Sequence, residues 1–504
     1  MRLRNSSEVQ GMNVATVRRA AFAVAAAAVL VAGFAGAGHA AVLCVSASGT
    51  MPAGLARKLG CSSTVYKTIS DGVGAAASSD TVFVLHGTYN EMVTIPSSLT
   101  GLTLMGQNPK NTIIDATGLQ NGIFDQASNV IIDGFTVQNA AHEGILVEGP
   151  LATCSGSPLT CVPSALEITG ITIADNLVLD NDKAIDTGTT PPSCPLSGSV
   201  PAAPTFEQQD CGEGIHLDGV AFSTVTGNRV EHNEGGILLT DETNPNHDNL
   251  VSDNIAEDNA SDCGITLPSH PPNGSGENVG VQSFGVFDDT VAGNLSEGNG
   301  DFGVGAFAPT PGTASYKHLI VGNRLIKNGG PGVGFHSHAP GQKLNGSEVV
   351  GNVIQGNGAD PNPGPGETNG PADPTGIDVY ADVAAAPLTG IKIVGNTIKG
   401  ETNDIWVGAP SWSNCGSAAK PCYVVDAHLN NFAPHSIGVN NAGAPVTAGD
   451  AQAQAAVIVA GYSVLVQATN DFWGCAKGPG AGPCASVKGN VTDVPFLTKP
   501  SAIH

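Results

Sequence analysis

A short phrase recurs through the middle of this chain and restricts the folds open to it. Each copy begins with a dipeptide that ends in Asn, followed by four residues and a second Asn. Further on, a Gly or Ala precedes an apolar residue. The first Asn residues of the copies are Asn176, Asn228, Asn254, Asn294, Asn323 and Asn352. The spacing between the two Asn residues is constant, whereas the distance between copies varies. A fixed core with variable insertions predicts stacked units rather than a globule with one centre.

Apolar residues alternate inside each copy, as in Ile215-His216-Leu217-Asp218, and the alternation stops at Gly or Asn. This pattern predicts strands of a few residues joined by tight turns. One copy then forms one coil of a β-solenoid, and successive coils stack at roughly 4.8 Å as parallel sheets. We expect the first Asn of each copy to form a column in which side-chain amides bond along the stack. In the copy that starts at Asn176, the strand is expected at Ala184-Ile185.

Residues 1–40 have the features of a secretory signal peptide. Arg18 and Arg19 precede an apolar run from Ala20 to Phe34, and small residues near Ala40 fit a cleavage site. The run is too short to be a membrane anchor. The arginine pair also permits a twin-arginine interpretation. We therefore expect a secreted or periplasmic protein without a membrane span.

The remaining residues, 41–504, are expected to form one all-β solenoid domain. A helix from Tyr66 to Ala77, with Ile69 and Val73 on one face, would cap the first coil and cover the exposed sheet edge. The expected parts are the first coils at 64–115, the Asn- and Gly-rich coils at 116–409, and the C-terminal coils with a cap at 410–504.

The chain is acidic, with a formal net charge of −24. Removal of residues 1–40 takes away four arginines and one glutamate, which makes the balance −27. Such a chain repels nucleic acid and anionic membranes, and it repels polyanionic sugars unless a cation bridges them. Calcium is the cofactor considered for the acidic turns, although no motif identifies such a site.

The eleven cysteines fall as near neighbours, which favours export and local disulfides across insertions. The neighbouring pairs are Cys44 and Cys61, Cys154 and Cys161, Cys194 and Cys211, Cys415 and Cys422, and Cys475 and Cys484, with Cys263 left over. Sequence alone does not prove the pairing.

The chain resembles the right-handed parallel β-helix superfamily, the pectin-lyase-like fold, at both ends. Gly87-Thr88-Tyr89-Asn90-Glu91 is similar to an opening motif of pectin methylesterases. The ending from Ala468 to Gly474, with Gly478-Pro479 and Val494 to Leu497, resembles the ending of secreted β-helix proteins, including periplasmic copper-site maturation proteins. The resemblance implies right-handed coils. It specifies fold far better than function, because one fold hosts many activities.

Insertions gather near the Gly-apolar strand of the repeats and are expected to wall a groove along one side of the stack. They occupy residues 149–165, 188–212, 241–247, 268–283, 308–316, 339–345 and 359–375. Alternation along that strand predicts two outward columns. The first is Leu146, Asp186, His216, Leu238, Thr266, Gly305, Gly334, Asp378 and Trp406; the second is Glu148, Gly188, Asp218, Thr240, Pro268, Phe307, His336, Tyr380 and Gly408.

Asp186, His216 and Asp218 are the candidate catalytic residues. Asp186 is expected to stack against His216, and Asp218 lies two residues further along the same strand. The two carboxyls would then be about 8 Å apart, a separation that can flank a glycosidic bond with room for water. His216 or one carboxyl would act as the acid and another group as the base. The competing interpretation is a solvated acidic face in which Asp and His satisfy each other.

The candidate substrate-binding residues are Glu213, Thr240, Asp378, Tyr380 and Trp406. The aromatic ones, together with Phe307, would be sugar platforms if they are exposed. His336 and His338 alternate onto one face and form a weaker candidate metal site.

The motifs of well-known β-helix enzymes do not transfer. No later Asp or Arg-Pro-Trp motif of pectin methylesterases is found, and neither outward column offers the Arg or Lys base of pectate lyases. We therefore expect a protein that binds polysaccharide in the insertion-walled groove and could cleave or modify it as a hydrolase, lyase or epimerase. The alternatives are a non-enzymatic, adhesin-like surface protein and a periplasmic copper-handling protein, the latter disfavoured by only five Met.

Overall fold

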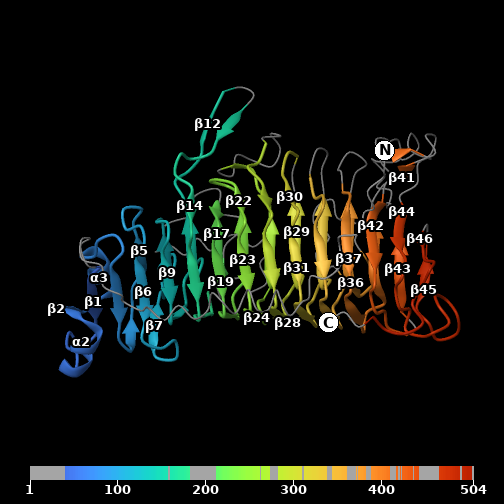
Figure 1. Ribbon diagram of the computed structural model, residues 1–504. Coiled ribbons are helices and arrows are strands. Elements are labelled where there is room, and N and C mark those ends of the chain that lie inside the picture. Colours follow the sequence, from blue (N-terminus) through green and yellow to red (C-terminus); the bar gives the residue numbers. More distant parts are fainter. Residues whose placement is uncertain are drawn as a thin grey trace, which may run out of the picture. The chain divides into compact units, whose positions relative to one another are not determined.

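The apolar alternation of each repeat forms short strands, and the strands of successive coils pair in parallel and in register. The computed structural model describes residues 40–501 apart from 157–158, 182–211, 261–262, 273–281, 309–310, 338–342, 360–370, 372, 382–387, 409–415, 418–419, 422, 435, 442–464 and 489–490. Within this part of the chain, coils follow one another along the stack in sequence order, as Figure 1 shows.

Three long parallel sheets form the coil walls, and we number them 1 to 3. Sheet 1 runs in the order β2 (Cys61–Tyr66), β1 (Val42–Val45), β3 (Thr81–Val84), β6 (Thr103–Gly106), β9 (Ile131–Asp133), β15 (Thr172–Ala174), β19 (Thr224–Thr226), β23 (Leu250–Ser252), β27 (Thr290–Ala292), β31 (Leu319–Val321), β34 (Glu348–Val350), β37 (Ile391–Val394), β42 (Tyr423–His428), β44 (Leu465–Ala468) and β46 (Val491–Thr492). Sheet 2 runs in the order β38 (Thr397–Lys399), β35 (Val353–Gln355), β32 (Arg324–Ile326), β28 (Leu295–Glu297), β24 (Ile255–Glu257), β20 (Arg229–Glu231), β16 (Leu177–Leu179), β10 (Thr136–Gln138), β7 (Thr112–Asp115) and β4 (Gly87–Tyr89).

Sheet 3 carries the strands that follow the Gly of the repeat. Its order is β45 (Ser486–Lys488), β43 (Ile437–Asn441), β39 (Asn403–Gly408), β36 (Thr375–Ala381), β33 (Val333–Ser337), β29 (Val304–Ala308), β25 (Ile265–Pro268), β21 (Gly235–Thr240), β17 (Glu213–Asp218), β11 (Ile145–Glu148), β8 (Ile123–Asp125) and β5 (Val93–Ile95). A shorter sheet 4, which the sequence did not predict, contains β14 (Ile168–Thr169), β18 (Val220–Ala221), β22 (Asn246–His247), β26 (Val286–Phe287) and β30 (Ser315–Tyr316).

Each coil visits sheets 1, 2 and 3 in turn, so the fold is a right-handed parallel β-helix, as predicted. The apolar residue of each inward position stacks on its counterpart in the next coil. Ile215, Ile237 and Ile265, for example, are paired in register and have no exposed surface. Figure 1 also shows the hairpin β12 (Thr153–Ser155) and β13 (Thr160–Val162) projecting from the stack. A second small hairpin joins β40 (Gly416–Ser417) and β41 (Lys420–Pro421).

The predicted column of Asn side chains is present and extends beyond the six copies. The backbone N–H and the Nδ2 of Asn228 both donate to Oδ1 of Asn254 at 3.0 Å, and Asn228 Nδ2 also donates to the Ile173 carbonyl at 2.9 Å. The same pattern links Asn176, Asn228, Asn254, Asn294, Asn323, Asn352, Asn396 and Asn430 and ends at Asp471. Each Asn side chain thus forms hydrogen bonds with backbone groups of the turns that do not pair within a sheet.

The second Asn of the repeat forms an equivalent ladder, which the sequence argument did not include. It links Asn181, Asn233, Asn259, Asn299, Asn328 and Asn357 and ends at Glu401. This ladder is part of the reason for the Gly of the repeat. A Cβ on Gly214 would overlap Cγ1 of Val230 and lie 2.9 Å from Nδ2 of Asn233, so packing against the next coil and the ladder together require Gly here.

The start of the stack is capped by α3 (Ile69–Gly74), a shorter helix than the one predicted, with Ile69 and Val73 buried as expected. Thr68 caps it by accepting from the Asp71 N–H. The Glu91 carboxylate accepts from the N–H of Ile69 at 2.8 Å, which gives the Glu of the opening motif a structural role. A further helix, α2 (Ala53–Leu59), precedes β2. Neither of the two described helices is long and apolar enough to cross a bilayer.

Three of the five expected cysteine pairs are disulfides in the described part of the chain. They join Cys44 to Cys61, Cys154 to Cys161, and Cys475 to Cys484. Each staples a short loop, as the near-neighbour spacing predicted. The other two pairs, Cys194 with Cys211 and Cys415 with Cys422, each include residues outside the described part, and Cys263 is buried.

Candidate functional site

The register of sheet 3 confirms the phasing of the outward columns in the strands that the structure describes. The first column pairs Leu146, His216, Leu238, Thr266, Gly305, Gly334, Asp378 and Trp406 in that order. The second contains Glu148, Asp218, Thr240, Pro268, Phe307, His336, Tyr380 and Gly408. All of these residues are buried except Phe307, which is partly exposed, so this face is covered and is not an open groove lined by both columns.

The sequence argument expected Asp186 beside His216 in sheet 3, but the described strands place Leu146 there. The neighbours of β17 in sheet 3 are β11 and β21, and Leu146 is the residue paired with His216 on the β11 side. The described sheet-3 strand of the Asn176 coil therefore begins at Glu213, after an insertion, whereas the sequence argument expected it at Ala184-Ile185, which lie outside the described residues. Both segments fit the same apolar pattern, and only the pairing decides between them. Asp186 itself lies outside the described residues.

A buried trio of side chains, Glu143, Glu213 and His216, lies at this point of sheet 3. Glu143 and Glu213 each stand immediately before the Gly of their repeat, and the Gly144 N–H donates to the Glu213 carbonyl at 3.0 Å. One oxygen from each carboxylate and one ring nitrogen of His216 lie within 4.8 Å of one another. The three residues are 0%, 2% and 1% exposed, so their charges interact in a medium that screens poorly.

A hydrogen-bond chain fixes the orientation of the His216 ring. The Thr240 hydroxyl donates to Asp218 Oδ1 at 3.3 Å, so it accepts from the His216 Nε2–H at 2.8 Å. The other ring nitrogen, Nδ1, lies 3.9 Å from Glu143 Oε1. The chain from Asp218 through Thr240 therefore points Nδ1 of His216 toward the carboxylates, an orientation that suits proton transfer or metal binding.

Asp218 also holds a turn together. Its Oδ1 accepts from the backbone N–H of Glu242 at 2.8 Å and of Thr243 at 3.2 Å. Burial raises the pKa of this carboxyl, and the nearby His216 lowers it in part. Asp218 thus acts on His216 indirectly, through Thr240, and its catalytic role stays a prediction.

Asp218→Ala is expected to lower the free energy of unfolding by about 2–4 kcal/mol, because two buried N–H groups lose this acceptor. Asp218→Asn keeps an oxygen at the same place and should cost less than half as much. Urea unfolding of the two variants measures the difference. Equal stability of Asp218→Ala and the wild-type protein would contradict the structural role.

The second predicted cluster is buried as a layer of contacting rings that includes a His–Asp pair. His336 Nε2 and Asp378 Oδ2 lie 2.8 Å apart, and the His336 ring contacts Tyr380 at 5.4 Å between centroids. Tyr380 contacts Trp406 in turn, at 6.0 Å. Tyr380 has no exposed surface and Trp406 is 7% exposed, so the condition for sugar platforms is not met in this structure. His338 lies outside the described residues.

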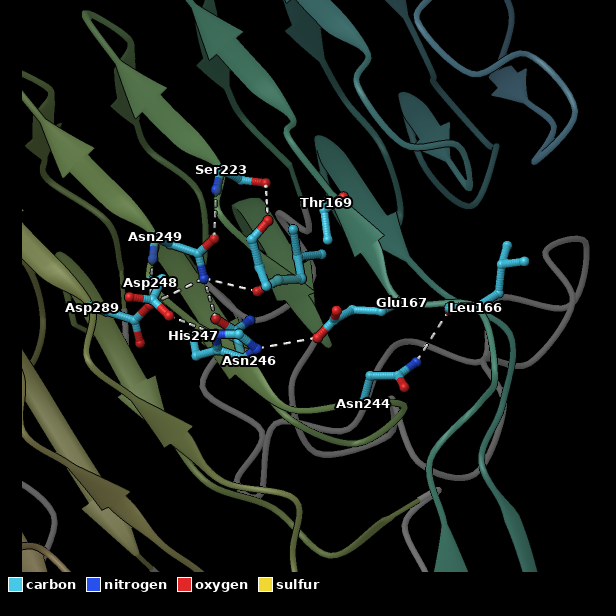
Figure 2. Close-up of polar contacts among 12 residues, drawn as sticks. Leu166, Glu167, Thr169, Ser223, Asn244, Asn246, His247, Asp248, Asn249 and Asp289 are labelled. Atoms are coloured by element: carbon cyan, nitrogen blue, oxygen red, sulfur yellow. Dashed lines mark hydrogen bonds and ion pairs between the residues drawn. The ribbon is translucent and has the colours of Figure 1, made fainter.

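The sequence argument missed a group of residues along sheet 4, centred on His247 in the middle strand β22; Figure 2 shows its polar members Glu167, His247 and Asp248. His247 lies between Glu167 and Asp248, at 3.1 and 2.9 Å. Its ring stacks on Phe287 at 4.9 Å and contacts the edge of Phe222 at 5.2 Å. The sequence contained a signal for this group. A ring-bearing residue stands two residues before a polar residue in three successive coils: His247 before Asn249, Phe287 before Asp289 and Tyr316 before His318.

Phe222 is the most exposed member of that group. It is 60% exposed and has φ +53°, a left-handed conformation that bulky residues rarely adopt. In the next two coils the corresponding positions are Asp248 and Asp288, which tolerate this conformation. The chain therefore keeps an exposed aromatic ring where a small polar residue would be less strained.

No known protein family matches the chain, and no curated protein is similar enough to count as a relative. Among solved structures, the Agl-KA catalytic domain is 12% identical, with a TM-score of 0.44 over 84% of this chain and 64% of that one. A GH87 α-1,3-glucanase catalytic domain is 11% identical, with a TM-score of 0.39 over 82% and 63%. The A-module of Azotobacter vinelandii mannuronan C-5 epimerase AlgE6 is 12% identical, with a TM-score of 0.31 over 84% and 93%. This chain thus spans just under two thirds of the first two proteins, and these values assign it neither a family nor an activity.

Proposed function

We propose that this protein binds polysaccharide outside the cytoplasm and modifies it at the Glu143–Glu213–His216 trio. The observation that carries the proposal is the meeting of two carboxylates and one oriented imidazole within 4.8 Å. Carboxylates and imidazoles are the groups that transfer protons in glycan hydrolysis, elimination and epimerisation. The three disulfides fit an oxidising compartment, which supports the expected export.

Phe222 gives the proposal a surface to which a glycan can bind. Its ring is exposed, and His247 and Glu167 beside it offer polar atoms for sugar hydroxyls. Phe222 also lies in the same coil as His216, a few residues beyond the end of β17. A glycan bound at Phe222 would therefore contact the same coil that carries Glu213 and His216.

Two variants test the chemistry and one tests the binding. Wild-type protein is screened on a glycan array, and the glycans that bind are then incubated with it and assayed for new reducing ends, unsaturated products or epimers. We expect Glu143→Gln and Glu213→Gln to lower turnover at least 100-fold and to leave binding within twofold. Phe222→Ala should weaken binding at least tenfold. Val494→Ala, which shortens an apolar side chain of similar exposure, 61%, is the matched control.

The second candidate function is non-enzymatic, a rigid surface or adhesin-like role, and the burial of the trio favours it. In that case the trio only stabilises the stack, and glycan binding occurs without turnover or does not occur. Binding that disappears in Phe222→Ala, with no product from the wild-type protein, would support this role. No binding to any glycan would reject the carbohydrate proposal as a whole.

A further inference from the structure

We infer that Glu143, Glu213 and His216 bind one divalent first-row transition metal ion, with zinc as the best match. Each residue offers one donor atom, and the three donor atoms lie within 4.8 Å of one another. Two donors bound to zinc at about 2.0–2.1 Å with tetrahedral angles lie roughly 3.3 Å apart. The observed 3.9 Å between His216 Nδ1 and Glu143 Oε1 and the 4.8 Å limit on all three separations exceed that value, so the side chains must rotate inward to bind the ion.

The charge of the trio favours a cation. Two carboxylates that share a buried site repel each other, and burial removes the water that would screen them. Both glutamates are essentially without exposed surface. Within the trio itself, one imidazolium balances a single negative charge, whereas a divalent ion balances two carboxylates and leaves the imidazole neutral, which is the form that binds metals.

The surroundings of His216 match those of a metal ligand. Histidine ligands characteristically donate their second N–H to an oxygen, which fixes the tautomer and the ring orientation. His216 donates Nε2–H to Thr240, and Thr240 donates to the buried Asp218. Nδ1, which lies 3.9 Å from Glu143 Oε1, would then be the ring atom that binds the metal. The chain from Asp218 to His216 therefore supports the ligand without contacting the ion itself.

The donor set selects the class of ion. Calcium takes oxygen ligands almost exclusively, so an imidazole in the set argues against it. One imidazole and two carboxylates suit zinc, manganese or iron(II), and three protein ligands leave a position for water, as in catalytic zinc sites. A metal-bound water with a pKa near 7 would then supply the base for the chemistry proposed above. The metal site uses the residues of the proposed function but requires no polysaccharide.

The test is metal binding by the full mature chain without glycan. Protein stripped with a chelator is titrated separately with Zn²⁺ and Mn²⁺ by calorimetry, and bound metal is counted by mass spectrometry after desalting. We expect one Zn²⁺ per chain and an unfolding temperature that rises with added Zn²⁺. Glu213→Gln and Glu143→Gln, which keep side-chain shape, should weaken Zn²⁺ binding at least 100-fold and abolish this rise. Thr240→Val should weaken it about 10- to 100-fold.

His318→Gln is the matched control, because His318 is also buried and faces a carboxylate, with Nδ1 3.5 Å from Asp289 Oδ2, but is absent from the trio. It should bind Zn²⁺ like the wild-type protein. The inference is overturned if the stripped wild-type chain takes up no stoichiometric Zn²⁺ or Mn²⁺, or if folded Glu213→Gln and Glu143→Gln bind as tightly as wild type. Zinc uptake without glycan turnover would reject only the proposed function, and glycan turnover by a chain that takes up no stoichiometric Zn²⁺ or Mn²⁺ would reject only the metal site.

Discussion

Replacing Asn254 with Ala is expected to lower the free energy of unfolding by about 3–5 kcal/mol. In the wild-type protein, Asn254 Oδ1 accepts from the backbone N–H and the Nδ2 of Asn228, both at 3.0 Å. Its own Nδ2 donates to the Val225 carbonyl at 2.9 Å and to Asn294 Oδ1 at 3.0 Å. All of these bonds are buried, so the substitution leaves several polar groups short of a partner where water does not reach.

Urea unfolding followed by circular dichroism measures this loss. Asn90→Ala removes the same side chain from an exposed position and should change stability by less than about 0.5 kcal/mol. Asn254→Asp keeps the acceptor but places a second oxygen against two acceptors, so it should also be costly at neutral pH. If Asn254→Ala were as stable as Asn90→Ala, the ladder would contribute nothing to the stability of the stack.

Stability is expected to fall as pH rises from about 5.5 to 8, by an amount on the order of a few kcal/mol. Burial raises the pKa of Asp125, Glu401 and Asp471 to about 7. In the unfolded chain these carboxyls have pKa values near 4, so the folded state holds protons that the unfolded state has already released. The contribution of these protons to the free energy of unfolding is complete below about pH 4 and is lost as pH rises through 7.

Buried His318 acts in the opposite direction at lower pH. Burial lowers its pKa to about 3, so the folded state loses stability as pH falls below about 6.5. One such histidine offsets only part of the contribution of three carboxyls. The unfolding midpoint should therefore be highest under mildly acidic conditions, and urea titrations at pH 5.5, 7 and 8 measure its position.

Asp471→Asn isolates one of these carboxyls. Asp471 Oδ1 accepts from the backbone N–H and Nδ2 of Asn430, at 2.7 and 3.0 Å, and an Asn oxygen can do the same. The variant should be about 1–2 kcal/mol more stable than wild type at pH 8 and no more stable at pH 5. Asp253→Asn, the same change at an exposed position, should leave both values unchanged. An equal effect of both variants would mean that burial of Asp471 is not the cause.

Much of the fold could be predicted from the sequence because fixed spacings carry it. The constant interval between the two Asn residues, together with the alternation after Gly, predicted both the ladder at Asn228 and the register that pairs His216 with Leu238. Once it is known which residues of the repeat point inward, stacking its copies leaves few alternative registers between neighbouring strands.

The candidate site was harder to predict because it depends on which coils are neighbours. Because of the insertion after Asn181, the strand of that coil begins only at Glu213. Ala184-Ile185 shows the same apolar pattern earlier in the chain, so the sequence argument put Asp186, instead of Leu146, beside His216. Glu143 went unrecognised, although it and Glu213 both stand immediately before a repeat Gly. The burial of Tyr380 could not be predicted from the sequence either, because it depends on what packs over sheet 3.

The Asn ladders have a direction, because the bonds between Asn residues all run one way: each Asn donates to the Asn Oδ1 of the next coil and accepts from the Asn of the previous coil. Each interior coil therefore presents the same acceptor on one side and the same donors on the other. A whole coil, such as the one between Asn294 and Asn323, could be removed or duplicated and its neighbours would still match. Removal or duplication of only part of a coil would leave the neighbouring coils mismatched. Changes in the length of this protein should therefore come in complete turns, and Asp471 and Glu401 mark where such growth ends, since a carboxyl side chain, unlike the Asn amide, has no N–H to donate to a further coil.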